Sequence, residues 1–341
     1  MTSSERTLAD YGPAGRALER TVLSGRISPS YLLEGSDADD LGEVALAFAV
    51  ALLGGREPGP RGARVRRLVA QDHHPDLHRV QKDKPSVISV ASLAAHLEEA
   101  HQKPLEGARQ VFLIEPADAM ENAGIARYLK ALEEPPEGTV FVLVSMHPDR
   151  LPATVLSRVR RVRFPPVPPD AIADRLVQEG IRAERPARLA RWGGGSLARA
   201  RRIATDALDD AARRLAEAGL RGGEVAGAVG DVLAHVDRVA VSRAEAAGTD
   251  APETKRQHVR GVLSDLITLL AVEARDAAAT RRGESQANRR PDPIVTVDPE
   301  AALVWLERLG SLSAAVHANV TPAVILLELT RTLATAASGH R

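Results

Sequence analysis

Short apolar runs alternate with amphipathic segments over roughly the first half of the chain. These runs lie at residues 31–33, 77–80, 111–114, 140–144 and 162–164. The third and fourth runs are apolar at every position, and strands of that kind are buried on both faces, as in a parallel sheet covered by helices. The pattern therefore predicts an α/β module built on a parallel sheet.

The segment between the third and fourth runs predicts a helix. Its apolar residues Ile125, Tyr128, Leu129 and Leu132 recur at i, i+3, i+4 and i+7, which gives one apolar face. Pro135-Pro136 ends the helix, because proline has no N–H and disfavours helical geometry in the residue before it. A strand, a helix and a strand in this order predict a right-handed βαβ unit.

The strand pattern stops after Phe164, and the rest of the chain predicts helices. Pro165–Pro169 reads as an extended linker, after which Asp170 and Ser196 are expected to cap helices. Thr321 and Pro322 predict the start of the last helix. Polar interruptions are expected at 247–253 and 281–293, the second as a mobile loop. This organisation predicts an α/β module at 1–165, a three-helix unit at 166–206 and an all-helical region at 207–341.

The first apolar run leads into a glycine, as a strand leads into a phosphate-binding loop. Such a loop continues G-x-x-x-x-G-K-[ST], whereas Gly35 is followed at those three positions by Asp40, Leu41 and Gly42. The second glycine, the lysine and the magnesium-binding hydroxyl are all absent, and Asp37 and other carboxylates would repel a phosphate. The alternative is that Gly35 is an ordinary turn glycine.

Composition limits the classes of function. A chain of 341 residues exceeds the usual size of a single core, so several domains are expected. A net charge of +0 gives no overall nucleic-acid signature, and the absence of cysteine excludes disulfides and thiolate zinc sites. Without an apolar stretch of membrane-spanning length or a signal-peptide pattern, we expect a soluble, cytoplasmic protein.

Several motifs together resemble a known family. The most specific is Leu129-Lys130-Ala131-Leu132-Glu133-Glu134-Pro135-Pro136, which His74-Pro75-Asp76 precedes and Leu156-Ser157-Arg158 follows along the chain. With the altered loop, these segments resemble the AAA+ module of bacterial DNA polymerase III clamp-loader subunits, most closely the delta-prime group, since the gamma/tau motor subunits keep their phosphate loop. The resemblance implies that 166–206 is a lid and 207–341 a collar that holds the subunits in a ring.

Departures from the family pattern bear on activity. The strand that should end in Asp-Glu ends in Glu115-Pro116, so the glutamate that would orient water is missing. No ATPase activity of the chain alone, no bound cofactor and no metal are expected. The resemblance instead implies that Arg158, with Ser157, acts as an arginine finger in a neighbour's ATP site. The alternative reading is that Arg158 is a surface arginine like Arg160, Arg161 and Arg163.

Other candidate residues leave alternatives open. His74, Asp76 and His78 could suit a metal but also a strand-entry turn. Arg61, Arg64, Arg66 and Arg67 could contact DNA phosphates or form a solvated helix face, and Asp37, Asp39 and Asp40 do not meet the calcium-loop pattern in register. Ser145 and Arg199 occupy positions of phosphate sensors, with a strand-end hydroxyl and a structural ion pair as the alternatives.

Three functions follow from these observations. The leading hypothesis is a non-hydrolysing clamp-loader subunit whose partners are gamma/tau-like motor subunits and the delta subunit, and which acts through the complex on the sliding clamp and primer-template DNA as part of the DNA-directed DNA polymerase holoenzyme. The second is a weakly active ATPase with an unusual loop. The third is an inactive AAA+ scaffold outside the clamp loader.

Overall fold

The computed structural model describes residues 7–84, 87–181, 186–221, 225–246, 252–279, 299–317 and 320–338. The chain divides into two compact units, Met1–Pro166 and Val167–Arg341, and each is described by itself. The expected interruption at 281–293 and most of the one at 247–253 lie outside the described residues.

The first unit contains a five-stranded sheet in the order β2-β3-β4-β1-β5. All neighbouring strands are parallel, which confirms the predicted sheet. The strands are β1 (Ser30–Glu34), β2 (Leu77–Gln81), β3 (Gln110–Glu115), β4 (Thr139–Ser145) and β5 (Arg160–Arg163). The strand predicted at 162–164 begins two residues earlier, because β5 pairs with β1 from Arg160 onward. Its first residues are charged, as an edge strand allows, so the apolar pattern did not indicate them.

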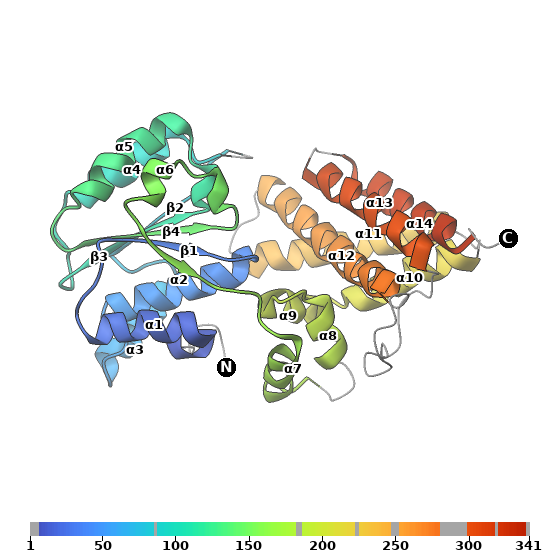
Figure 1. Ribbon diagram of the computed structural model, residues 1–341, viewed down its shortest axis with the longest axis horizontal. Helices are drawn as coiled ribbons and strands as arrows, with labels where there is room; N and C mark the ends of the chain where they lie inside the picture. Colours follow the sequence, from blue (N-terminus) through green and yellow to red (C-terminus); the bar gives the residue numbers. More distant parts are fainter. Residues whose placement is uncertain are drawn as a thin grey trace. The chain divides into compact units, whose positions relative to one another are not determined.

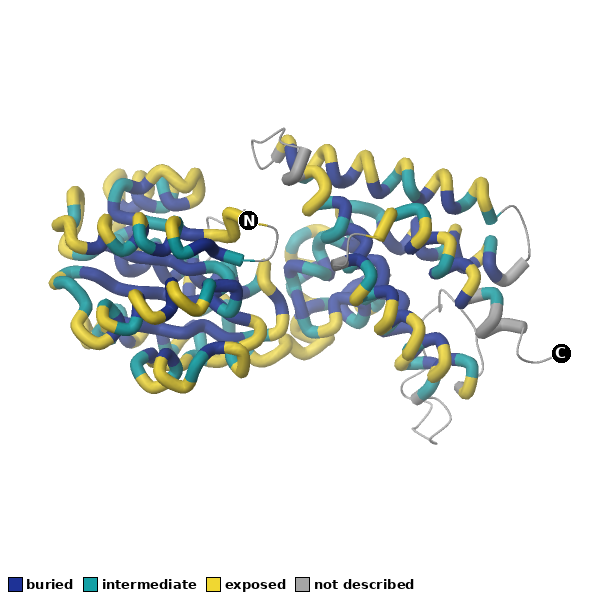
Figure 2. The backbone as a smooth tube through the Cα atoms, turned by 90° about the horizontal axis from the view of Figure 1, so that it is seen from above, coloured by how far each residue is buried: buried dark blue, intermediate teal, exposed yellow. Residues whose placement is uncertain are grey.

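Helices cover both faces of this sheet, as Figure 1 shows. One face carries α1 (Gly12–Leu23), α2 (Ala38–Leu52) and α3 (Pro60–Ala70), and the other carries α4 (Val90–Ala100), α5 (Asn122–Glu133) and α6 (Ala153–Leu156). Alternate strand residues enter separate cores: Leu33 packs beneath α2, whereas Leu32 packs on the α5 side. Both faces of the sheet are therefore buried (Figure 2), which explains the continuous apolar runs.

The predicted helix between β3 and β4 is α5. Ile125, Tyr128 and Leu132 are buried against the sheet, and the helix ends at Glu133, before Pro135-Pro136. The last residue of α5 is therefore held at a fixed position beside the sheet, where it becomes relevant to the candidate site.

All the regular secondary structure among the described residues of the second unit is helical. It contains α7 (Pro169–Gln178), α8 (Pro186–Trp192), α9 (Leu197–Thr205), α10 (Leu208–Arg221), α11 (Val225–Ala246), α12 (Pro252–Ala279), α13 (Pro299–His317) and α14 (Pro322–Ser338). The prediction that Asp170 caps the first of these helices was wrong: Pro168 is the N-cap and the helix begins at Pro169, whose fixed φ suits the first helical position. Ser196 caps α9 as predicted, since its Oγ accepts from the N–H of Arg199 at 2.9 Å.

One apolar core joins the short helices of this unit to the long ones. Trp192 of α8 and Trp305 of α13 are both buried in it. The division of residues 167–341 into a lid and a collar stays a prediction. In the part of the chain that the structure describes, no helix is both long and apolar enough to cross a bilayer.

Candidate functional site

The altered phosphate loop lies at the carboxyl ends of the strands, where open α/β folds bind ligands. In such folds the site is outside the carboxyl ends of the parallel strands. Here β1 ends at Glu34, Gly35 follows, and α2 begins at Ala38. The N-terminus of a helix at this position presents backbone N–H groups and a partial positive charge, which together bind an anion.

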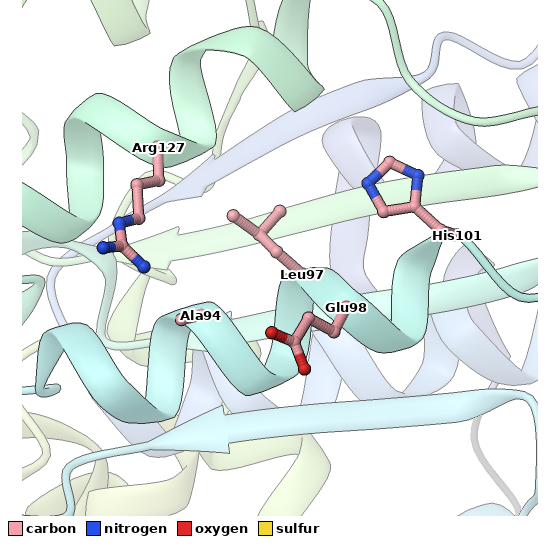
Figure 3. A pocket seen from close by; sticks show the side chains of 5 residues that line it. All are labelled: Ala94, Leu97, Glu98, His101 and Arg127. Atoms are coloured by element: carbon pink, nitrogen blue, oxygen red, sulfur yellow. The ribbon is translucent and has the colours of Figure 1, made fainter.

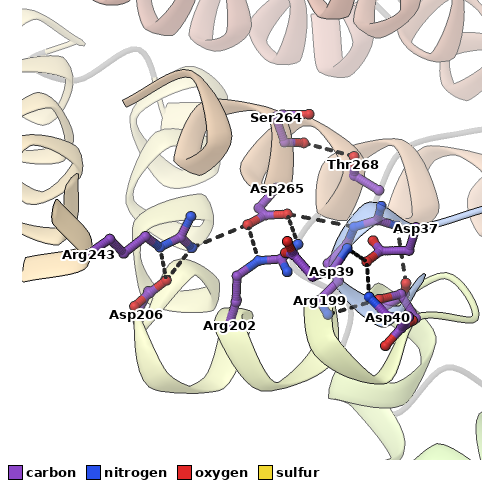
Figure 4. Close-up of polar contacts among 12 residues, drawn as sticks. Asp37, Asp39, Asp40, Arg199, Arg202, Asp206, Arg243, Ser264, Asp265 and Thr268 are labelled. Carbon is purple, nitrogen blue, oxygen red and sulfur yellow. Dashed lines mark hydrogen bonds and ion pairs between the residues drawn. The ribbon is translucent and has the colours of Figure 1, made fainter. Parts of the chain in front are cut away.

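In this chain a carboxylate of the protein itself uses those N–H groups. Asp37 is the N-cap of α2, and its Oδ1 accepts from the N–H of Asp39 at 3.1 Å and of Asp40 at 3.2 Å (Figure 4). Asp37 is only 5% exposed. The anion at the helix N-terminus is therefore built into the sequence, and the calcium-loop alternative gains nothing from this arrangement.

The position of the missing lysine is filled by apolar packing. Leu41 is 1% exposed and belongs to the core beneath α2. It lies against the glycine of the loop, since a Cβ at Gly35 would come within 3.1 Å of Leu41 Cδ2. A side chain that should reach out toward a phosphate instead points into the protein.

The residual second motif is neutralised by an arginine on the adjacent strand. Glu115 Oε2 accepts from Arg79 Nη2 at 3.1 Å, and Arg79 Nη1 lies 3.3 Å from Asp72 Oδ1. The other oxygen of Glu115 lies against the bare backbone of Gly42, 2.7 Å from where a Cβ would stand. The structure thus brings Glu115 beside Gly42 at the start of α2, with the cationic side chain of Arg79 next to it. Pro116 follows Glu115 and offers no carboxylate.

The two sensor-like residues engage neighbouring residues of their own unit. Ser145, at the end of β4, donates to Asp118 and accepts from the N–H of His147 at 3.0 Å. Arg199 Nη1 donates to the carbonyl of Gly193 at 3.2 Å, and its Nε lies 3.6 Å from Asp265. Both observations agree with the structural alternatives for these residues.

Asp265 is the centre of a larger ion network in the second unit (Figure 4). Arg202 of α9 binds it through two hydrogen bonds of 2.9 Å, and Arg243 of α11 lies 3.3 Å away while also binding Asp206. Asp265 is 5% exposed. The network ties α9 and α11 to α12, and Arg199 is the residue in it that the sequence analysis had considered.

The residues considered for a metal make a turn into β2. His74 Nδ1 accepts from the N–H of Asp76 at 3.1 Å, and burial lowers the pKa of His74. The carboxylate of Asp76 accepts from three consecutive N–H groups, those of residues 105–107, at 2.5, 2.9 and 3.2 Å. His78 binds Glu99 at 2.7 Å. Among the described residues, no three His, Asp or Glu side chains are placed to share a metal ion.

The basic residues near α3 are paired at the surface. Arg64 binds Glu106 through both of its terminal nitrogens, Arg61 lies 3.6 Å from Glu57, and Arg66 donates to the carbonyl of Gly55. These contacts favour a solvated helix face.

A surface hollow of about 200 Å³ lies between α4 and α5 and is lined by Ala94, Leu97, Glu98, His101 and Arg127 (Figure 3). It contains none of the predicted site residues.

Arg158 lies near the amino ends of the strands, whereas the altered loop lies at their carboxyl ends. It follows α6, whose C-cap is Ser157, and it precedes β5. A surface hollow of about 530 Å³ is lined by Arg158, Ser157, Leu132, Glu133 and Pro29. Pro29 precedes β1 and Gly35 follows it, so the length of β1, about 16 Å at 3.3 Å per residue, separates the two places.

The guanidinium of Arg158 is held by two structural elements. Its Nε donates to Glu133 Oε1 at 2.6 Å, and its Nη2 contacts the same oxygen. Its Nη1 donates to the carbonyl of Thr154 at 2.7 Å and to Ser157 Oγ at 3.1 Å. The side chain remains 30% exposed. Sequence reasoning named Ser157 and Arg158 but missed Glu133, the acidic partner of Arg158, which belongs to the most specific motif of the chain.

The comparisons with known proteins agree with these features. Residues 13–168 match the family model described as DNA polymerase III, delta subunit. The delta′ subunit of Bacillus subtilis is 35% identical over 169 residues, which are 49% of this chain and 51% of that protein. The delta′ subunit of Pseudomonas aeruginosa is 37% identical over 163 residues, 44% of this chain and 48% of that one. The chain thus spans about half the length of these two curated relatives.

A tau/gamma subunit is also similar over part of the chain. A DNA polymerase III tau/gamma subunit of Haemophilus influenzae is 29% identical over 190 residues, 53% of this chain and 27% of that protein. A solved structure of a gamma subunit-related protein from Thermotoga maritima has 18% identity and a TM-score of 0.49, covering 94% of this chain and 99% of its own.

The parallel sheet, its two helical layers and the altered phosphate loop lie within the first unit, which contains nearly all of the residues that match the family model. Residues 13–168, somewhat under half of the chain, match the family described as DNA polymerase III, delta subunit, and the two delta′ subunits are similar to this chain over about half of its length.

Proposed function

We propose that this protein is a non-hydrolysing delta′-like subunit of a bacterial DNA polymerase III clamp loader and that it donates Arg158 to the ATP site of a neighbouring motor subunit. One observation carries the proposal: Arg158 lies near the start of β1, and the loop follows the other end of that strand, which is about 16 Å long. An arginine at that place serves no nucleotide bound beside Gly35, but it is exposed to a subunit packed against this surface.

The altered loop supports the absence of hydrolysis. Asp37 already occupies the helix N-terminus, and Leu41 is packed in the core. A carboxylate about 4 Å from a phosphate oxygen repels it by roughly 4 kcal/mol at an effective dielectric of 20. Calorimetric titration of the isolated chain with magnesium-ATP should therefore give no binding, and a dissociation constant in the micromolar range would favour the weakly active ATPase instead.

The donated arginine would act electrostatically. A guanidinium placed against the transferring phosphate stabilises the charge of the transition state and contributes about three to five decades in rate. The chain would complete a motor subunit's site without binding ATP itself. The gamma/tau-like subunits and the delta subunit would be its direct partners, and the assembly would place a sliding clamp on primer-template DNA during replication, in the cytoplasm.

The second unit would supply the remaining parts of such a subunit. Residues 166–206, which contain α7, α8 and α9, would be the lid, and residues 207–341 would be the collar that holds the ring. The chain would contribute to a DNA polymerase holoenzyme without an active site of its own.

Reconstitution tests the proposal. The complex is assembled with motor subunits, delta, clamp and primed DNA, and DNA-stimulated ATP hydrolysis and clamp loading are measured with wild type and with Arg158→Ala. The variant should lose hydrolysis at the adjoining site by at least about a thousandfold. Arg163→Ala removes an exposed arginine of β5 and should leave the rate unchanged. An unchanged rate with Arg158→Ala would exclude the finger, and failure to co-purify with motor subunits would favour the scaffold.

A further inference from the structure

We propose that Glu133 is a positioning residue that pairs with the Arg158 guanidinium in the free chain. When the subunits assemble, a neighbour's triphosphate replaces the Glu133 carboxylate in this pair. This inference rests on the proposed function of Arg158. It concerns a residue at the end of α5 that lies far from the chain's own altered loop.

The contacts show which part of the guanidinium is held. Nε and Nη2 form one edge of the planar group, and both contact a single oxygen, Glu133 Oε1. That edge is the one that binds a carboxylate or a phosphate through parallel hydrogen bonds. Nη1 is held separately, by the carbonyl of Thr154 and by Ser157 Oγ. A phosphate can therefore take the Nε and Nη2 edge only when Glu133 leaves it.

Charge leads to the same conclusion. A carboxylate left beside Arg158 would repel the phosphate that the arginine is to bind, because the two anions would compete for one cation. The complex must therefore exchange the Glu133–Arg158 pair for an Arg158–phosphate pair. The remaining contacts with Thr154 and Ser157 would keep the arginine pointing from the same place on the surface during this exchange.

Exposure makes the exchange easy. The Glu133 side chain is 48% exposed and that of Arg158 is 30% exposed, so water screens their attraction. Exposed ion pairs of this kind shift an equilibrium by a factor of about 1.5 to 5. The pair is strong enough to order the arginine in the free chain and weak enough for a triphosphate, which carries more charge, to displace it.

The test uses the reconstituted complex with Glu133→Gln. Removing the competing charge should raise kcat/KM for ATP hydrolysis about two- to fivefold. Glu134→Gln changes the next carboxylate along the chain, which is exposed and has no bond to Arg158, and it should have no effect. The double variant Glu133→Gln/Arg158→Ala should match Arg158→Ala alone, because the glutamate acts only through the arginine.

The outcomes separate this inference from the proposed function. If Arg158→Ala loses activity while Glu133→Gln leaves kcat/KM unchanged or lowers it, Arg158 is a finger but Glu133 does not hold it back. If Arg158→Ala has no effect, the finger itself is wrong. In the free chain, the Arg158 Nε–H should exchange slowly with water by nuclear magnetic resonance and should exchange faster in Glu133→Gln; equal exchange rates would also overturn the inference.

Discussion

Acidification should loosen the first unit through one buried histidine. His96 of α4 is 5% exposed, its Nε2 lies 3.1 Å from the carbonyl of His78, and its Nδ1 contacts the hydroxyl of Tyr128. Because a carbonyl only accepts, Nε2 carries the proton and Nδ1 accepts from Tyr128. Burial favours this neutral form of the ring over the charged one. It matters for the site because Tyr128 lies on α5, the helix that ends at Glu133.

The size and sign of the effect follow from the pKa. Burial lowers the pKa of His96 from 6.5 to about 4, while an unfolded chain keeps the ordinary value. Between these values the unfolded state binds more protons, so the free energy of unfolding rises with pH over that range. The contribution of His96 is complete above pH 6.5 and is lost as the pH falls toward 4. The loss is about 2 kcal/mol at pH 5 and about 3 kcal/mol below pH 4.

Hydrogen exchange read by mass spectrometry measures this loss in the first unit itself. Tryptophan fluorescence would not report it, because both tryptophans lie in the second unit. After correction for intrinsic rates, peptides from β3 and α5 should lose protection between pH 7 and pH 5. His96→Gln keeps a donor and an acceptor but does not titrate. Between pH 7 and pH 5 the free energy of opening of these peptides should therefore fall by about 2 kcal/mol less in His96→Gln than in wild type. His101→Gln, at an exposed position just after α4, should behave as wild type. The same pH dependence in wild type and His96→Gln would refute the reasoning.

Two further predictions concern the altered loop and the helical unit. Leu41→Lys restores the lysine of the motif but buries an ammonium at a position that is 1% exposed; it should lower the free energy of unfolding by about 3 kcal/mol without creating ATP binding, as denaturant unfolding and calorimetry would measure. Glu273 is 1% exposed and accepts from Trp192 Nε1 at 2.7 Å and from Arg191 Nη2 at 3.2 Å. Glu273→Ala should cost about 3–5 kcal/mol and change tryptophan fluorescence, while Glu273→Gln, which keeps an acceptor, should cost less; equal losses for the two would contradict this reading.

Local patterns predicted most of the first unit. Residues 111–114 and 140–144 form central strands because they are apolar on both faces, and α5 ends before Pro135-Pro136 because proline cannot continue it. The pattern was less accurate at β5 and at the start of α7. An edge strand exposes charged side chains, and a proline can occupy a first helical position as well as a linker.

The sequence by itself determined the composition of the altered loop, its missing lysine and hydroxyl, and the motif that contains Arg158. Only the tertiary structure decided what replaced the lost groups: Asp37 at the helix N-terminus, Leu41 in the core, and Arg79 beside Glu115. The pair of Glu133 with Arg158 was likewise decided there. These contacts join residues that are 25 and 36 positions apart in two of the four cases. Such partners are set by strand order and helix packing, which no local periodicity records.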